Sequence, residues 1–132
     1  MPELTLLEDG MCFGCGKNNP IGLKLEFEKQ GEDYVGEFTP RTEHQGWAGI
    51  THGGILTTVL DEAMGRLSWL EGYGTVTAEM TVRFKRPAPT GKKLEIRGRI
   101  TGEEGRRLYC SAEAIDSDGQ VVTEATSVLV KV

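Results

Sequence analysis

The sequence predicts an α+β fold in which one long helix packs against a single antiparallel β-sheet. One segment shows the apolar spacing of a buried amphipathic helix, and several others alternate apolar and polar residues as strands do. Short polar turns separate the later segments, and consecutive strands joined by short connections pair antiparallel. A helix with a broad apolar surface must bury it, and the sheet is the element that can cover it.

Chain length and composition limit the functional classes. The 132 residues predict one domain over residues 1–132 with a single hydrophobic core. The first ten residues lack the features of a secretory signal, and no apolar run approaches the roughly 20 residues that span a bilayer. We therefore expect a cytoplasmic protein with no membrane partner. A net charge of −5 argues against nucleic acid as a partner, because such binding needs a basic surface.

Residues 1–22 are rich in turn-forming glycine and asparagine and show no periodicity, which predicts an irregular segment. Within it, Cys12 and Cys15 form a C-x-x-C motif. One such motif supplies only two of the four ligands that a structural zinc takes, and the remaining histidines and cysteine match no zinc module in their spacing. A purely structural role is favoured, so no metal and no cofactor are predicted. Metal binding and redox chemistry stay open as alternatives.

Two strands are predicted before the helix. Apolar and polar residues alternate over residues 23–27, and a second strand follows at residues 34–39 after a turn at 30–33. Residues 40–51 then form a polar loop that contains glycine.

The helix is predicted at residues 54–70 and ends before Gly72 and Gly74. Its apolar residues recur at spacings of three, four and seven: Ile55, Leu56, Val59, Leu60, Ala63, Met64 and Leu67. Such a broad stripe indicates a helix that is buried over most of its circumference.

Four more strands are predicted after the helix, with turns at residues 87–91, 102–105 and 116–119. They cover residues 76–86, 94–100, 108–114 and 121–132. Cys110 alternates with apolar neighbours in the third of them, so we expect it to be a buried small hydrophobic residue.

The junction His52-Gly53-Gly54 is the most informative stretch for function. Glycines let the backbone approach a ligand closely, and the first N–H groups of a helix have no intrahelical partners. These groups lie at the positive end of the helix dipole and can bind an anion or an oxyanion. The alternative is a tight turn that only lets the helix enter a packed sheet.

Asp61 lies seven residues after Gly54, two helical turns away and on nearly the same face. Its neighbours are apolar, so we expect Asp61 to be buried, and buried carboxylates are rare unless they are paired or functional. The alternative is that Asp61 faces solvent beside Glu62. Glu62 lies roughly 100° around the helix, so it is the expected solvent-facing member of the pair and the fallback catalyst.

The segment HGGILTTVLDEAMG resembles the central-helix motif of hotdog-fold acyl-CoA thioesterases of the PaaI (phenylacetate-degradation) type. MCFGCGKNNPIGLKLEF and VTAEMTVRFKRPAPTG resemble the thioesterase-superfamily branch of the same group. The likeness runs from about residue 12 to the C-terminus. It implies a hotdog fold, in which an antiparallel sheet wraps around the central helix, and hydrolysis of an acyl-CoA thioester to a free acid and CoA.

The resemblance also implies roles for single residues. The backbone N–H of Gly53 would bind the thioester carbonyl as oxyanion donor, and Asp61 would act as nucleophile or as general base on water. Thr77 falls where the family places a Ser or Thr that holds this water or the carboxylate. Taken alone, Thr77 is an ordinary strand residue.

One position departs from the family pattern. An Asn or Gln often stands seven residues before the first glycine, and here Gly46 occupies that position with Gln45 as its neighbour. Gln45 could serve if the loop is shifted by one residue. His52 is expected to support the turn, and His52, Gly54 and Glu62 are expected beside the substrate.

Helical geometry separates the two halves of this site. Gly53 and Asp61 are eight residues apart, about 12 Å of helical rise, whereas one thioester must approach both within roughly 3–3.5 Å. We therefore predict a homodimer with shared active sites, which the resemblance also implies. A dimer of dimers is the expected larger assembly. The anionic phosphates of CoA could meet three basic residues near a strand end: Arg83, Lys85 and Arg86. These side chains could equally form a solvated surface.

Two other functional classes stay open. A non-catalytic acyl- or CoA-binding hotdog protein would be favoured if Asp61 were salt-bridged and inaccessible. A hotdog dehydratase needs a catalytic histidine paired with an acid, and the chain contains only His44 and His52.

Overall fold

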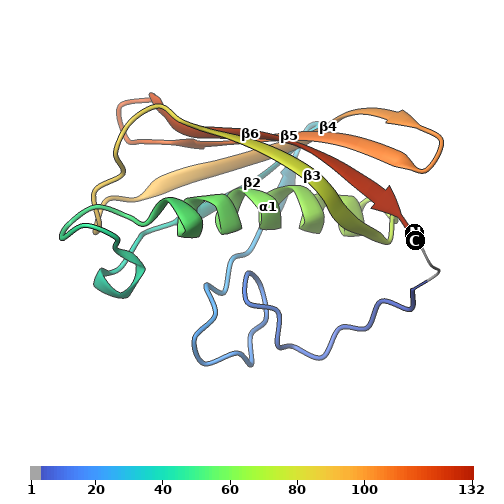
Figure 1. Cartoon of the computed structure of the whole chain (residues 1–132), viewed down its shortest axis with the longest axis horizontal. Helices are drawn as coiled ribbons and strands as arrows, with labels where there is room; N and C mark the ends of the chain where they lie inside the picture. Colours follow the sequence, from blue (N-terminus) through green and yellow to red (C-terminus); the bar gives the residue numbers. More distant parts are fainter. Residues whose placement is uncertain (1–3) are drawn as a thin grey trace.

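A six-stranded antiparallel sheet and one helix form two layers in the computed structural model, which describes residues 4–132 (Figure 1). The strands are β1 (Glu28–Gln30), β2 (Asp33–Phe38), β3 (Thr75–Phe84), β4 (Leu94–Glu104), β5 (Arg107–Ile115) and β6 (Val121–Lys131). The helix α1 spans Gly53–Leu70, and a short 3-10 turn η1 spans Thr42–His44. This arrangement confirms the predicted α+β class and the single long helix.

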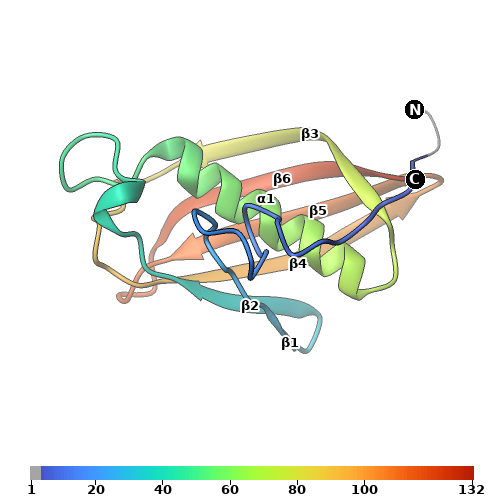
Figure 2. The ribbon, with the colours of Figure 1, turned by 90° about the horizontal axis from the view of Figure 1, so that it is seen from below.

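The strand order is β1-β2-β4-β5-β6-β3, so β3 lies at one edge of the sheet although it follows α1 in the chain. Helix α1 lies against one face of the sheet, and the irregular N-terminal segment crosses the other side of the helix (Figure 2). The helix is thereby covered on two sides. No helix in residues 4–132 is long and apolar enough to cross a bilayer.

The predicted apolar stripe forms the core. Six apolar residues of α1 are buried, at most 3% exposed: Leu56, Val59, Leu60, Ala63, Met64 and Leu67. Cys110 on β5 is buried against them, as predicted. Gly98 on β4 allows close packing, because a Cβ there would lie 2.9 Å from the Leu67 side chain.

The strand predicted at residues 23–27 is wrong. Lys24 has a φ of 55°, which interrupts an extended chain, and the first strand is the shorter β1. The backbone N–H of Leu25 donates instead to the carbonyl of Gly14 at 2.9 Å. Leu25 is nevertheless buried, so the apolar alternation reflects a loop packed on the core rather than a strand in the sheet.

Asp33 joins β2 to the neighbouring strand β4. Its Oδ2 accepts a hydrogen bond from Arg97 Nη1 at 2.8 Å, and its Oδ1 accepts one from Arg99 Nε at 2.7 Å. Asp33 is only 8% exposed. The hydrogen bonds from Arg99 and Arg97 hold the pKa of Asp33 below its usual range, although burial opposes them.

We predict that Asp33→Asn lowers the free energy of unfolding by about 1–2 kcal/mol, because charge-assisted hydrogen bonds are lost. The loss stays this small because solvent partly screens the two arginines. A lowered pKa stabilises the fold above the unfolded pKa, about 3.9 for Asp. The difference between wild type and variant should therefore shrink as the pH falls through and below about 4. Urea unfolding at several pH values measures it. Glu37→Gln, which disrupts an exposed pair with Lys93, is the control; equal losses in both variants would contradict the prediction.

Candidate active site

The N-terminus of α1 leaves one backbone donor free. His52 caps the helix, and its Nδ1 accepts a hydrogen bond from the Gly54 N–H at 2.8 Å. The N–H groups of Ile55 and Leu56 donate to the His52 carbonyl at 3.0 and 3.2 Å. The Gly53 N–H has no acceptor within residues 4–132. It is thus available to a ligand at the positive end of the helix dipole, whereas the Gly54 N–H is not.

The same hydrogen bond defines what His52 does in this chain. Because Nδ1 accepts from Gly54, the neutral ring carries its hydrogen on Nε2. His52 is exposed, and this contact supports the turn before the helix. This contact is structural, and a contact between His52 and the substrate stays a prediction.

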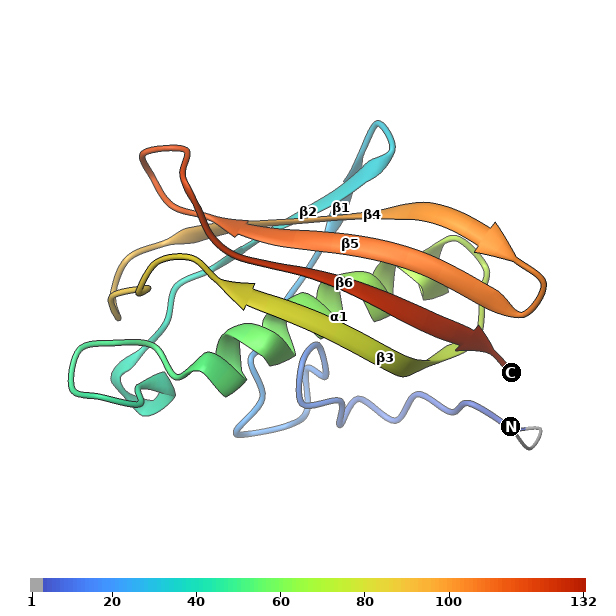
Figure 3. The ribbon, with the colours of Figure 1, turned by 45° about the horizontal axis from the view of Figure 1, so that its top comes forward.

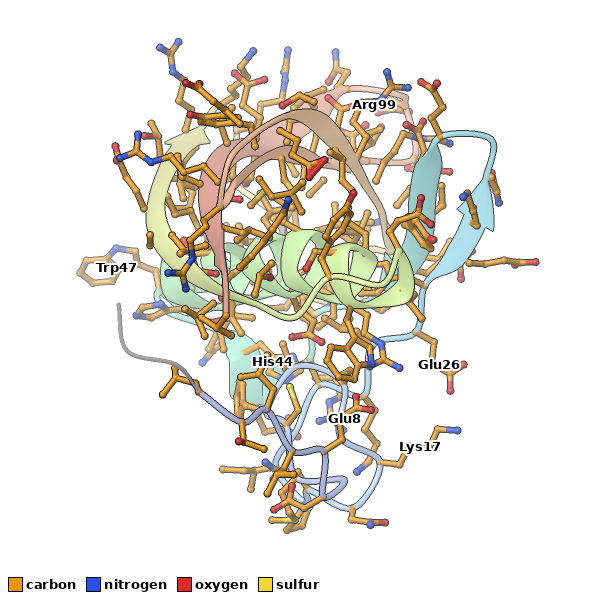
Figure 4. All side chains as sticks on the ribbon, turned by 90° about the vertical axis from the view of Figure 1, so that its right-hand side faces the viewer. Glu8, Lys17, Glu26, His44, Trp47 and Arg99 are labelled. Carbon is orange, nitrogen blue, oxygen red and sulfur yellow. The ribbon has the colours of Figure 1, made fainter. Side chains whose placement is uncertain are left out.

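The free N–H of Gly53 borders a depression of about 450 Å³. Its lining consists of Gly46, Trp47, Ile50, Thr51, His52 and Gly53. Trp47 is 86% exposed and projects away from the molecule (Figure 4). This depression was not among the predicted features, although two large apolar residues in a polar loop, Trp47 and Ile50, are a signal for it.

Gln45 closes the loop that carries this depression. Its Oε1 accepts a hydrogen bond from the Gly49 N–H at 3.0 Å, and Gln45 pairs with Thr51 in an isolated β-bridge. Within the described chain, no hydrogen bond joins Gln45 to Asp61. The structure therefore gives Gln45 a loop-stabilising contact, and its orienting role stays a prediction.

Asp61 and Thr77 lie together. Thr77 Oγ1 donates a hydrogen bond to Asp61 Oδ1 at 2.8 Å. A register shift between Thr77 and Glu79 in the pairing of β3 with β6 marks a bulge beside this contact, and such bulges re-aim side chains. Asp61 is half-buried rather than buried as the sequence analysis expected. Its second oxygen, Oδ2, accepts no hydrogen bond among the described residues.

Gly53 and Asp61 belong to one unbroken helix of 18 residues. Eight residues of α-helix separate them by about 12 Å along the axis. A single chain therefore does not bring the free N–H and the carboxylate to one reacting atom.

Glu62 was expected to be the solvent-facing member of the pair, but Glu62 and Asp61 are both half-buried. The side chain of Glu62 is half-buried under the N-terminal segment, where its Oε2 accepts a weak hydrogen bond from Cys12 Sγ at 3.6 Å. Burial and the neighbouring Glu62 carboxylate raise the pKa of the Cys15 thiol above its usual range. Glu62 therefore belongs to a cluster with Cys12 and Cys15, and its role as a fallback catalyst stays a prediction.

The three basic residues divide between two environments. Arg83 lines a depression of about 540 Å³ on the outer face of the sheet, together with Arg99, which Figure 4 shows opposite α1. Lys85 Nζ forms an ion pair with Glu124, 3.3 Å away, which lines the same depression. Arg86 forms no ion pair within residues 4–132. The structure thus separates Arg83 and Lys85 from the helix terminus, where the Phe84 ring lies beside Gly53.

Comparisons with known proteins place the chain among thioesterase-like sequences. A family model described as the thioesterase superfamily matches residues 48–123. Acyl-coenzyme A thioesterase THEM4 of Xenopus laevis is 33% identical over 95 residues, which cover 71% of this chain and 43% of that protein. Acyl-coenzyme A thioesterase THEM5 of Mus musculus is 28% identical over 114 residues, covering 78% and 46%. The chain therefore spans less than half the length of these two relatives.

Solved structures share the fold. Protein RHA08564, a thioesterase superfamily protein, superposes with a TM-score of 0.87 at 24% identity, covering 92% of this chain and 61% of that one. The E. coli PaaI protein from the phenylacetic acid degradation operon gives 0.76 at 18% identity, covering 82% and 85%. A hypothetical thioesterase of Streptococcus pneumoniae, solved with coenzyme A, gives 0.76 at 20% identity, covering 82% and 85%. These likenesses confirm the predicted hotdog fold.

Proposed function

This chain belongs to the thioesterase superfamily, and from that premise we propose that it hydrolyses an acyl-CoA thioester to a free acid and CoA. The observation that carries the proposal is the hydrogen bond from Thr77 on β3 to Asp61 on α1. The first N–H of the same helix, at Gly53, has no acceptor in residues 4–132. The names of the THEM4 and THEM5 relatives and the coenzyme A in the S. pneumoniae structure support the choice of substrate class.

In the proposed reaction, a water molecule or the Asp61 carboxylate attacks the thioester carbon, and the C–S bond breaks to release CoA. As a general base, Asp61 would take a proton from the water; as a nucleophile, it would form an anhydride that water then opens. Thr77 occupies Oδ1, which leaves Oδ2 for the water or the carbonyl carbon. Both routes need the same orientation of the carboxylate.

The developing negative charge on the thioester oxygen would be stabilised by the Gly53 N–H. A fixed backbone donor at a helix N-terminus costs no reorganisation when the charge forms. The absence of a side chain at Gly53 matters as well, because a Cβ there would lie 3.3 Å from the Phe84 ring. The acyl carbonyl would thus reach the donor between the loop and the end of β3.

We propose that two chains complete each site, with Gly53 from one and Asp61 from the other. Gly53 and Asp61 of one chain are separated by about 12 Å of helical rise, too far for both to reach one thioester, which supports this arrangement. Strand β3 also supports it, because ten residues form a free edge of the sheet (Figure 3). Long exposed edges are normally covered in soluble proteins. A homodimer that covers β3, and a dimer of dimers built from it, would be the assembled enzyme.

The two alternative functions have less support from the contacts. Asp61 forms no ion pair within residues 4–132 and is only half-buried. A binding module without catalysis was expected to have a salt-bridged, inaccessible Asp61. Among residues 4–132, neither histidine is paired with an acid as a dehydratase requires. His44 is buried, which lowers its pKa, and its Nδ1 accepts from the Arg41 N–H at 2.9 Å. The Nδ1 of His52 is held by Gly54.

We predict that Asp61→Asn lowers kcat for acyl-CoA hydrolysis by about 10²–10⁴-fold, because the amide can neither take the proton nor attack. Thr77→Val should cost less, since it misplaces the carboxylate without removing it. A thiol-release assay over short, long and aromatic acyl-CoA esters measures both, with Asp118→Asn in an exposed turn as control. No release from any ester by wild type, or full activity in Asp61→Asn, would contradict the proposal.

We further propose Arg86 as a contact for the CoA phosphates, because it follows Phe84 by two residues and has no ion pair in the described chain. Arg86→Gln should raise KM for acyl-CoA by about three- to tenfold and leave KM for the N-acetylcysteamine thioester unchanged, since that ester lacks the phosphates. Arg83→Gln on the outer face is the matched control. Equal effects on both esters, or a larger effect of Arg83→Gln, would exclude this contact.

A further inference from the structure

We propose that Cys12, Cys15 and Glu62 form a binding site for zinc or a similar thiophilic divalent cation. The C-x-x-C motif supplies two ligands, and the fold brings a third from helix α1, fifty residues further along the chain. The two sulfurs and a Glu62 carboxylate oxygen all lie within 4.8 Å of one another. This site is separate from the contact between Asp61 and Thr77 and does not depend on the proposed hydrolysis.

The distance between the Cys12 sulfur and the Glu62 carboxylate fits tetrahedral zinc. Bonds of about 2.3 Å to sulfur and about 2.1 Å to oxygen, at a tetrahedral angle, place the two ligand atoms about 3.6 Å apart. The distance from Cys12 Sγ to Glu62 Oε2 is 3.6 Å. This pair of ligand atoms therefore already has the separation that a shared zinc ion requires, and the remaining pairs lie within 4.8 Å.

The turn that carries the two cysteines lies close against Glu62. The Gly16 N–H donates to the Cys12 carbonyl at 2.8 Å, which closes the turn. A Cβ on Gly16 would lie 2.4 Å from the backbone nitrogen of Cys12, and a Cβ on Gly14 would lie 2.5 Å from Glu62 Oε2. Gly16 therefore excludes a side chain, because the clash is with backbone. At Gly14 the clash is with the flexible Glu62 side chain, so a larger residue there would displace the Glu62 carboxylate from the cysteine turn.

The surroundings can complete the coordination. Cys12 is exposed, and both cysteines line a groove of about 740 Å³ that is open to water, which can take the fourth position. Two thiolates and one carboxylate around a divalent cation leave a net charge of −1. Lys17 and Arg66 line the same groove together with Glu8 and Asp9, and Arg66 pairs with Glu8 at 2.6 Å, so these four side chains add no net charge around the site. Thiolate ligands select zinc over magnesium and calcium, which prefer oxygen.

Cation binding would tie the N-terminal segment to the catalytic helix. That segment crosses α1 on the side away from the sheet (Figure 2), and Glu62 directly follows Asp61 in the chain. A cation that binds only the folded form raises the melting temperature in proportion to the logarithm of its concentration above Kd. The site would thereby fix the position of α1 and keep the N-terminal segment in place.

Cobalt binding by the reduced full-length chain tests the proposal. We expect one Co²⁺ per chain, a thiolate-to-cobalt charge-transfer band, the visible bands of tetrahedral cobalt, and displacement of cobalt by zinc. The melting temperature should rise when zinc is added to the metal-free protein. Failure of the reduced protein to bind either metal in a one-to-one ratio would overturn the proposal. Oxidation of Cys12 and Cys15 by air to a disulfide, with no metal bound by the reduced pair, would overturn it as well.

Variants assign the ligands. Cys12→Ser and Cys15→Ser should abolish the charge-transfer band, and Glu62→Gln should weaken cobalt binding at least about tenfold, since even indirect partners of metal sites contribute ~10–100-fold. Cys12→His keeps a ligand and should retain binding. Cys110→Ala, which alters a buried thiol elsewhere, should bind as wild type does. Circular dichroism confirms that each variant is folded. Unchanged binding in Cys12→Ser or Glu62→Gln would exclude this ligand set.

Discussion

Helix α1 fixes the distance between the two chemical groups on which the proposed function depends. Gly53 opens the helix with a free N–H, and Asp61 lies more than two turns further along the same rigid element. Helical rise of about 1.5 Å per residue prevents one chain from applying both groups to one carbonyl. The proposed second chain follows from this helical distance if both groups act on one thioester, and the exposed edge strand β3 is the surface proposed for its binding.

The rest of the fold holds this helix in position. The sheet buries its apolar stripe, and Gly98 allows β4 to approach it closely. The connection from α1 to the edge strand β3 returns the chain beside the helix, so that Thr77 meets Asp61 at 2.8 Å. At the start of the helix, His52 occupies the Gly54 N–H and leaves that of Gly53 free. Packing and capping together thus position each proposed functional group.

The sequence predicted the elements whose periodicity is set by burial, and it was less informative where tertiary contacts decide. The stripe at residues 54–70 identified the helix to within one residue. Alternation at residues 23–27 suggested a strand, but the positive φ of Lys24 makes it a loop. Periodicity gave the angle of Glu62 around the helix, yet it could not reveal the cysteine turn above it. Strand alternation could have shown that Arg83 points opposite to Phe84.

Activity of mixed subunits tests the shared site most directly. Gly53→Pro removes the N–H at a helix position that tolerates proline, and Asp61→Ala removes the carboxylate; either chain alone should be inactive. In a heterodimer of the two, one of two sites regains both groups, so random mixing should restore about a quarter of wild-type kcat per chain. Mixed samples that stay as inactive as the parent variants, despite confirmed subunit exchange, would contradict the account.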